Sequence, residues 1–127
     1  MSRDIKFRVW SEKYKKMLEV QKHSFKTGLS MPYGSNMECY FEKIMQYTGL
    51  KAENGKEIYE GDILSIKIYS GDKVIVEGKT VVEFKDGCFG VIWGHDKAFL
   101  SLNSFFKAKF EVIGNIYENP ELLRGEK

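Results

Sequence analysis

One stretch of the chain decides its fold: Thr80-Val81-Val82-Glu83-Phe84-Lys85-Asp86-Gly87-Cys88-Phe89-Gly90-Val91-Ile92-Trp93. Asp86-Gly87 is typical of a two-residue hairpin turn, because both residues tolerate the positive φ angles that this turn requires. Counting outward from the turn predicts the register: Lys85 faces Cys88, Phe84 faces Phe89, Val82 faces Val91 and Thr80 faces Trp93. This register brings an aromatic pair and a β-branched pair together on one face, which stabilises a hairpin. The stretch therefore predicts two antiparallel strands.

A further strand is predicted just before this hairpin, at Ile63–Tyr69. Its side chains alternate between two faces with a period of two. We expect the purely aliphatic face to point inward, and it carries Leu64, Ile66 and Ile68. The other face carries Ile63, Ser65, Lys67 and Tyr69. The preceding Gly61-Asp62 pair is a recurrent entry into SH3-like barrels, since Gly permits a sharp turn and the Asp side chain can bind backbone N–H groups.

The same alternation predicts strands toward both ends of the chain. They are Ile5–Trp10, a returning strand through Met17, Leu18 and Val20, Cys39–Tyr47, and Phe110–Tyr117. A short helix is the alternative for Cys39–Tyr47, and Thr48-Gly49 is expected to end that element. Asn54-Gly55 predicts a second two-residue hairpin turn, with positive φ at both positions.

Two segments are predicted to lie outside the strands. Residues 21–38 are weakly patterned and contain Gly, Pro, Ser and Asn, so we expect a loop, the most mobile and replaceable part of the chain. Asn119-Pro120 predicts a terminal helical turn, with Asn119 as the N-cap and Pro120 at the first helical position. We expect Leu122 and Leu123 to plug one end of a barrel.

The length fits one domain over residues 1–127, because two separate cores would each be near the size at which a core is marginal. Hydrophobic residues make up 43% of the chain and aromatic residues 14%, and aromatic side chains favour strands. We therefore predict a mainly β fold: a small, partly open SH3-like barrel with extra strands and a short C-terminal helical turn.

The net charge of +2 is too small to indicate a phosphate-binding protein by itself. Residues 1–50 carry nine Lys or Arg against five Asp or Glu, whereas residues 51–127 carry eleven against thirteen. The basic excess of the first part is either a solvated face or a weak contact surface for anions. Small barrels also bind nucleic acid through aromatic side chains with basic neighbours. The outward residues that favour this alternative are Lys6, Arg8, Trp10, Lys67 and Tyr69.

Residues suited to nucleophilic catalysis are sparse in this chain. His23 lies in the weakly patterned segment, and His95 and Asp96 are adjacent in a turn, a poor arrangement for a base and the residue that orients it. Cys88 would act as a nucleophile only if His95 folded back onto it. We therefore expect Cys88 to be an ordinary strand cysteine and the protein not to be an enzyme.

Metal and cofactor sites are equally weakly supported by the sequence. Glu57, Glu60 and Asp62 could hold a hard cation, but they lack the ligand count of a calcium loop. The isolated glycines are each explained by a turn, and no motif that cradles phosphate is present. We predict no catalytic residue, no cofactor and no metal.

The sequence also indicates where the protein acts. No apolar segment typical of a secretory signal follows Met1, and no apolar run approaches the ~18 residues that a membrane helix needs. Cys39 and Cys88 are the only cysteines, fewer than a secreted domain of this size usually carries. We predict a soluble cytoplasmic protein with no membrane contact and with buried, unbridged thiols.

Three blocks of the sequence belong to one recognisable pattern. The opening block is Ile5-Lys6-Phe7-Arg8-Val9-Trp10, and the closing block is Val112-Ile113-Gly114-Asn115-Ile116-Tyr117-Glu118-Asn119-Pro120-Glu121-Leu122-Leu123. The central signature is Ile44-Met45-Gln46-Tyr47-Thr48-Gly49-Leu50-Lys51 followed by Asn54-Gly55-Lys56-Glu57-Ile58-Tyr59-Glu60-Gly61-Asp62-Ile63. In this order, the three blocks closely resemble the YopX-type proteins of bacteriophages and prophages. Residues 20–40 and 70–105 carry no motif of this family.

The resemblance implies a phage or prophage origin in a bacterial host, a mostly β fold with an SH3-like part, and a tendency to self-associate. It implies no activity and no catalytic residue. Our leading hypothesis is a non-catalytic accessory protein that acts through protein contacts, either as a homo-oligomer or by capturing a host or phage protein. The alternative is a nucleic-acid-binding β-barrel module.

The central signature supplies a candidate interaction surface. Its residues are Tyr47, Gly49, Asn54, Gly55, Tyr59, Gly61 and Asp62. The same residues could instead maintain the fold, with the glycines and Asp62 in turns and the tyrosines in the core.

Overall fold

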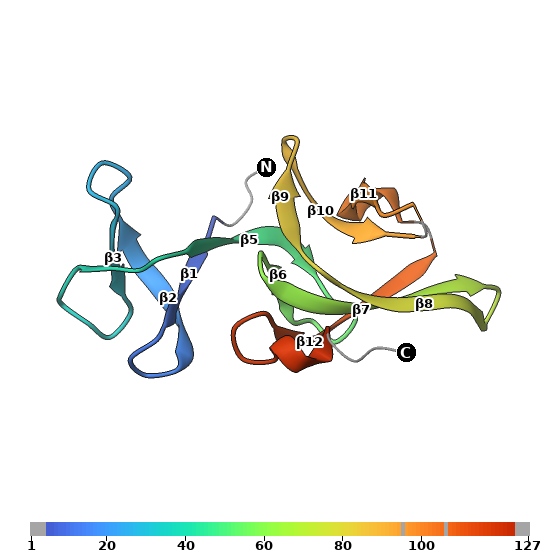
Figure 1. The fold of residues 1–127 in the computed structure, drawn as a ribbon, viewed down its shortest axis with the longest axis horizontal. Coiled ribbons are helices and arrows are strands. Elements are labelled where there is room, and N and C mark those ends of the chain that lie inside the picture. Colours follow the sequence, from blue (N-terminus) through green and yellow to red (C-terminus); the bar gives the residue numbers. More distant parts are fainter. Residues whose placement is uncertain (1–4, 95, 106, 124–127) are drawn as a thin grey trace. The chain divides into compact units, whose positions relative to one another are not determined.

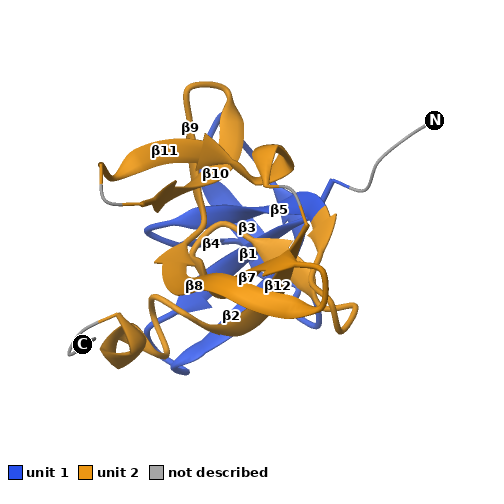
Figure 2. Ribbon diagram, turned by 90° about the vertical axis from the view of Figure 1, so that its right-hand side faces the viewer, with its two compact units in different colours: residues 1–49 blue, residues 50–127 orange. Residues whose placement is uncertain are grey.

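The computed structural model describes residues 5–94, 96–105 and 107–123, and strands dominate it (Figure 1). This confirms the prediction of a mainly β fold. The chain divides into two compact units, Met1–Gly49 and Leu50–Lys127, which are coloured separately in Figure 2. The prediction of one domain over residues 1–127 stays a prediction. The two units are described in turn.

Unit 1 is an antiparallel sheet with the strand order β4-β3-β2-β1-β5. Its strands are β1 (Phe7–Ser11), β2 (Lys16–His23), β3 (Leu29–Pro32), β4 (Cys39–Tyr40) and the first part of β5 (Ile44–Lys51). The predicted hairpin of β1 and β2 is confirmed, with Val9 opposite Leu18. The structure also settles the choice at Cys39–Tyr47: both of its structured parts are strands, so the helical alternative is wrong.

The prediction of a loop over residues 21–38 is wrong in part. Strand β2 continues to His23, and Leu29–Pro32 forms β3, in which Ser30 is buried. Within this pair, His23 Nδ1 and Ser30 Oγ lie 2.7 Å apart, which gives both side chains a hydrogen-bond partner. The buried residues of this four-residue strand are Ser30 and Pro32, whereas Leu29 and Met31 are only partly buried, so the sequence gives little sign of a strand.

Unit 2 contains two three-stranded antiparallel sheets, in the orders β12-β7-β8 and β11-β10-β9. Their strands are β7 (Asp62–Ser70), β8 (Lys73–Val81), β9 (Glu83–Lys85), β10 (Cys88–Trp93), β11 (Ala98–Ser101) and β12 (Ala108–Asn115). Only Val82 separates β8 from β9, so one stretch of chain passes from the first sheet to the second. The short strand β6 (Glu57–Tyr59) and two 3-10 helices, η1 (Leu102–Ser104) and η2 (Pro120–Leu122), complete the described elements.

The predicted hairpin at Asp86-Gly87 is confirmed. Lys85 pairs with Cys88 and Phe84 with Phe89, and the two Phe ring centroids lie 5.0 Å apart in an edge-to-face arrangement. Both turn residues have positive φ, 53° at Asp86 and 82° at Gly87. The sequence therefore predicted the correct turn and the correct register next to it. The ladder ends at the pair of Glu83 with Gly90, so the predicted pairs of Val82 with Val91 and of Thr80 with Trp93 are wrong. Thr80 pairs with Leu64 of β7 instead, because the chain changes sheets at Val82.

The core of unit 2 gathers side chains from every part of that unit. Its buried members are Ala52, Ile58, Leu64, Ile66, Val82, Val91, Leu102 and Val112. The inward face predicted for β7 is thus confirmed at Leu64 and Ile66, whereas Ile68 is only partly buried. Ile63, which was placed on the outer face, is fully buried as well, so β7 is covered on both faces at its start.

The turns around β5 and β6 differ from expectation. Strand β5 does not end at Thr48-Gly49 but runs on to Lys51. In the following turn only Gly55 has positive φ, at 84°, and its N–H donates to the carbonyl of Ala52. This is the geometry of an ordinary turn closed by one left-handed Gly, so the prediction of positive φ at Asn54 is wrong.

The C-terminal helical turn is confirmed as η2, with Pro120 at its start. Asn119 makes no side-chain cap; its Oδ1 instead accepts a hydrogen bond of 3.2 Å from the N–H of Asn115. The predicted plug is wrong, because no residue of η2 is buried and Leu123 is 37% exposed. Across the described ranges the sheets remain open rather than closing into a barrel, and an SH3-like arrangement stays a prediction.

Candidate functional site

The second half of the central signature forms a tightly bonded node in unit 2. Asp62 is buried, and its Oδ2 accepts a hydrogen bond of 2.8 Å from the N–H of Tyr59. Gly61 has a φ of 85°, which favours glycine, and its N–H donates to the carbonyl of Val82. The N–H of Ile116 donates to the carbonyl of Gly61. This node ties β6, β7, the junction of β8 with β9, and the segment after β12 to one another.

The structure separates the seven candidate residues by burial. Tyr47, Tyr59, Gly61 and Asp62 are buried, and Gly49, Asn54 and Gly55 are exposed. Only the exposed members can contact a partner directly in the folded chain. The signature therefore combines buried residues that stabilise the fold with exposed residues, two of which lie in the turn at residues 53–55.

The accessible tip, residues 53–55, borders a depression of roughly 370 Å³ in unit 2. Its lining residues are Glu53, Asn54, Ser65, Lys67, Tyr69, Lys109, Phe110 and Glu111. The N–H of Glu53 donates to the carbonyl of Phe110 at 2.9 Å, which fixes the tip against β12. The depression is thus built by the motif turn and the solvent side of strands β7 and β12.

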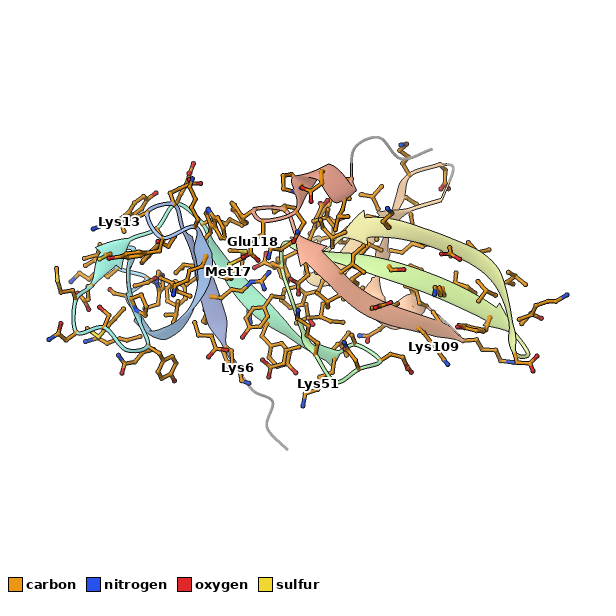
Figure 3. The ribbon with its side chains drawn as sticks, turned by 90° about the horizontal axis from the view of Figure 1, so that it is seen from below. Lys6, Lys13, Met17, Lys51, Lys109 and Glu118 are labelled. Carbon is orange, nitrogen blue, oxygen red and sulfur yellow. The ribbon has the colours of Figure 1, made fainter. Side chains whose placement is uncertain are left out.

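Charge is mixed in this depression. Lys67 lies directly opposite Lys109 in the sheet, and like charges in that position repel. The Lys109 ammonium lies 5.0 Å from the centroid of the Tyr69 ring, a cation–π distance, and Figure 3 shows Lys109 on β12. Glu53 and Glu111 supply opposite charges nearby, so the pair of lysines does not create a uniformly basic site.

The structure describes only some of the residues considered for catalysis. Cys88 is partly buried and its Sγ lies 3.6 Å from the carbonyl oxygen of Lys85 in the same hairpin. Cys39 is a free thiol on the surface, so the expectation that it is buried is wrong. His95 lies outside the described residues. No group of three His, Cys, Asp or Glu side chains suited to a metal ion occurs in the part of the chain that the structure describes.

The outward residues that favoured nucleic-acid binding divide between the two units. In unit 1, the Lys6 ammonium lies 5.4 Å from the Tyr47 ring centroid, and Trp10 Nε1 donates to Glu12 at 3.0 Å. Lys67 and Tyr69 belong to the depression of unit 2. Three of the five residues, Lys6, Arg8 and Trp10, therefore belong to unit 1 and the other two to unit 2.

Sequence reasoning missed the most exposed apolar residues. In unit 2 they are Phe84, at 53%, and three consecutive residues of β8, Val74, Ile75 and Val76, which are 40%, 57% and 45% exposed. In unit 1 they are Ile5, Tyr14, Phe25, Tyr33, Met37 and Tyr40, each at least 63% exposed. A run of three β-branched residues beside a two-residue turn was the available signal, but a buried strand has the same composition.

Comparison with known proteins decides the family. The sequence matches the YopX protein family over residues 6–124, which includes both compact units. The chain belongs to the YopX family. The YopX signature proposed from residues 44–63 is thereby confirmed as a family resemblance.

Two solved structures are similar in fold to this chain. The crystal structure of protein EF1440 from Enterococcus faecalis has a TM-score of 0.63 and 29% sequence identity, and the match covers 97% of this chain and 100% of that one. The X-ray structure of YopX from Bacillus subtilis has a TM-score of 0.65 and 24% identity, with 96% and 98% covered. A comparison with curated proteins gave no match. Among the described residues, neither helix has the length and apolar character needed to cross a membrane.

Proposed function

We propose that this YopX-family chain is a non-catalytic accessory protein of a phage or prophage, and that it acts through protein–protein contacts in the cytoplasm of a bacterial host. Self-assembly is the main form of contact, and a host or phage protein is the other possible partner. One observation carries the proposal: β8 exposes three consecutive β-branched side chains at the edge of a sheet.

This observation favours contact because exposed apolar surface is costly to keep in water. A folded chain gains free energy by burying it, at roughly 25 cal/mol per Å² removed from water. Contiguous apolar patches on soluble proteins are therefore typical of interfaces. An edge strand adds backbone N–H and C=O groups that another strand can pair with. Val74–Val76 combines both features in one short segment.

Sedimentation velocity over a wide concentration series tests self-assembly. One chain has a mass of 14.7 kDa, so the weight-average mass is expected to rise above this value as concentration increases. A single species of 14.7 kDa at every concentration would contradict self-assembly. The buffer contains no non-ionic detergent, because detergent would cover the exposed side chains of Val74–Val76.

Nucleic-acid binding is the second candidate, and the composition of unit 1 favours it. Residues 1–49 carry nine Lys or Arg against five Asp or Glu, and Tyr14, Tyr33 and Tyr40 are exposed there. The Lys13 ammonium lies 5.4 Å from the centroid of the Tyr14 ring, and Figure 3 labels Lys13 in this unit. Exposed aromatic rings with basic neighbours stack on single-stranded bases.

Fluorescence anisotropy with labelled single-stranded DNA and RNA tests this candidate. Phosphate contacts predict an affinity that falls linearly with salt on a logarithmic scale. Tyr14→Ala should weaken binding, and Tyr14→Phe, which keeps the aromatic ring, is the matched control and should bind like the wild type. Anisotropy that stays at the level of the free oligonucleotide at low salt would remove nucleic acid from consideration.

A further inference from the structure

The depression beside the accessible tip lies on the outer face of the sheet β12-β7-β8. Strand β7 contributes Ser65, Lys67 and Tyr69, and β12 contributes Lys109 and Glu111. The register keeps these side chains on one face, because Lys109 lies opposite Lys67 and Glu111 lies opposite Ser65. The side chains that line this part of the depression are thus placed by a regular strand pair and not by a loop.

Two lysine ammonium groups meet in the depression without a carboxylate between them. Lys67 is half-buried, and its ammonium makes no hydrogen bond or ion pair with any residue that the structure describes. The Lys109 ammonium lies 5.0 Å from the Tyr69 ring centroid, and within the described ranges it too has no carboxylate partner. Like charges directly opposite each other in a sheet are destabilising. An anion bound between the two lysines would relieve this repulsion.

Two neutral hydrogen-bond donors lie beside the lysines. Asn54 Oδ1 accepts a hydrogen bond of 3.1 Å from the N–H of Lys56, so the Nδ2 amide group of Asn54 is left to donate. The N–H of Glu53 donates to the carbonyl of Phe110 at 2.9 Å, which holds this turn against β12. Ser65 adds a hydroxyl group from β7. Two ammonium groups, an amide and a hydroxyl form a donor set suited to phosphate oxygens.

Carboxylates around the depression limit what it can hold. Glu53 and Glu111 line it, and Glu77 of β8 lies opposite Lys67 on the other side of that residue. A long polyanion would bring several phosphates near these carboxylates, and each like-charge contact would weaken its binding. A ligand with a single anionic group avoids these contacts, and its hydroxyl groups can donate to Glu53 and Glu111. The mixed charge therefore favours a small phosphorylated sugar over a nucleic-acid strand.

From this arrangement we propose that the depression binds a small sugar phosphate, either free or as part of a nucleotide. Lys67 and Lys109 hold the phosphate group from two neighbouring strands, and Asn54 and Ser65 donate to its oxygens. The two lining carboxylates accept hydrogen bonds from the sugar hydroxyls. The volume of roughly 370 Å³ suits such a ligand, because small-molecule sites span roughly 300–1,000 Å³. This binding site goes beyond the proposed protein contacts and does not depend on self-assembly.

An NMR titration of the isotope-labelled chain tests the site directly. The probes are inorganic phosphate, ribose-5-phosphate and adenosine monophosphate, each compared with sodium chloride at the same ionic strength. We expect saturable shifts at Asn54, Lys67 and Lys109. Ribose-5-phosphate should bind more tightly than inorganic phosphate, because only the sugar reaches the carboxylates. A tighter complex with adenosine monophosphate would identify nucleotides as the source of the ligand, and equal affinity would identify free sugar phosphates.

Substitution of the two lysines tests their role in holding the phosphate. Lys67→Gln and Lys109→Gln should each raise the dissociation constant for ribose-5-phosphate by about tenfold, because each removes a charge-assisted hydrogen bond. Lys85→Gln is the matched control. The Lys85 ammonium also lies over an aromatic ring, 5.5 Å from the Phe99 centroid, but Lys85 does not line the depression. This control should bind like the wild type.

Glu111→Gln should produce a change of the opposite sign. The substitution removes a negative charge beside the phosphate position, so inorganic phosphate should bind more tightly. The preference for ribose-5-phosphate over inorganic phosphate should narrow at the same time, because an amide oxygen accepts a hydroxyl less strongly than a carboxylate does. A damaged fold would weaken the binding of both ligands, so this variant distinguishes a lost site from a folding defect.

The outcomes separate the site from its alternatives. Shifts equal to those caused by sodium chloride, or an unchanged affinity in both lysine variants, would overturn the proposal. A single-stranded oligonucleotide that binds at these residues where ribose-5-phosphate does not would overturn the small ligand as the occupant. Saturable binding that both lysine variants weaken, and that Glu111→Gln strengthens for inorganic phosphate, would establish the site.

Discussion

The Oδ2 atom of Asp62 accepts a hydrogen bond of 2.8 Å from the N–H of Tyr59, three residues earlier, and both residues are buried. This bond closes the turn that leads into β7, the central strand of its sheet. Asp62→Ala would leave a buried N–H without its acceptor, which costs about 1–3 kcal/mol. Asp62→Asn keeps an acceptor oxygen and should cost less. Urea unfolding of both variants measures the difference, and equal stability of Asp62→Ala and wild type would refute the role of the node.

Ile66 and Ile75 are the same residue type in contrasting places. Ile66 is fully buried in the core of unit 2, and Ile75 is 57% exposed on β8, at the edge of its sheet. Ile66→Ala should lower the free energy of unfolding by about 2–5 kcal/mol, since it leaves a cavity. Ile75→Ala should change it by less than about 0.5 kcal/mol. Measurements belong at a concentration where the chain is monomeric, and a large loss for Ile75→Ala there would contradict its exposed position.

Gly90 and Gly78 test how closely the strands of unit 2 approach. A Cβ on Gly90 would collide with the backbone oxygen of Leu100, whereas a Cβ on Gly78 would touch only the edge of the Trp93 ring. Backbone cannot move aside as a side chain can, so Gly90→Ala should destabilise by about 1–3 kcal/mol. Gly78→Ala should cost clearly less. Thermal melting ranks the two variants, and the reverse order would contradict the packing of β10 on β11.

Glu12 gives a pH-dependent prediction for unit 1. Hydrogen bonds from Lys15 and then Trp10 lower the pKa of Glu12 below its ordinary value, with the nearby Lys15 charge adding to this. A lowered pKa in the folded state stabilises the fold above the unfolded pKa, and that contribution is lost as pH falls through the folded pKa. Glu12 is fully exposed, so the stabilisation is small. Lys15→Ala should raise the pKa of Glu12 in an NMR titration, and an unchanged pKa would refute the contact.

The sequence predicted those parts of the fold that depend on local signals. Asp86-Gly87 requires positive φ at two neighbouring positions, and this single requirement fixed the turn and the pairing of Phe84 with Phe89. The sequence also predicted that the Asp62 side chain binds a backbone N–H group. This was possible because the donor, Tyr59, lies only three residues away. The mainly β character followed from alternation and aromatic content.

The remaining parts depend on contacts between distant residues, which a single sequence does not display. Ile63 is buried although it lies on the face opposite Leu64, because β7 is covered on both sides at its start. Ser30 lies in a strand because it pairs with His23 of β2, and the two side chains are within hydrogen-bond distance. The exposure of Val74–Val76 was not predicted for the same reason. These residues have the composition of a buried strand, and only the strand order shows that they lie at the edge of a sheet.

Hydrogen exchange of the wild-type chain, measured at low and at high protein concentration, tests the central claim most directly. Contact between copies through the exposed edge of β8 covers backbone N–H groups there, so exchange across Lys73–Glu77 should slow as concentration rises, while exchange at the exposed turn of Asn54 and Gly55 stays constant. If exchange across Lys73–Glu77 is the same at both concentrations, this edge does not join copies of the chain.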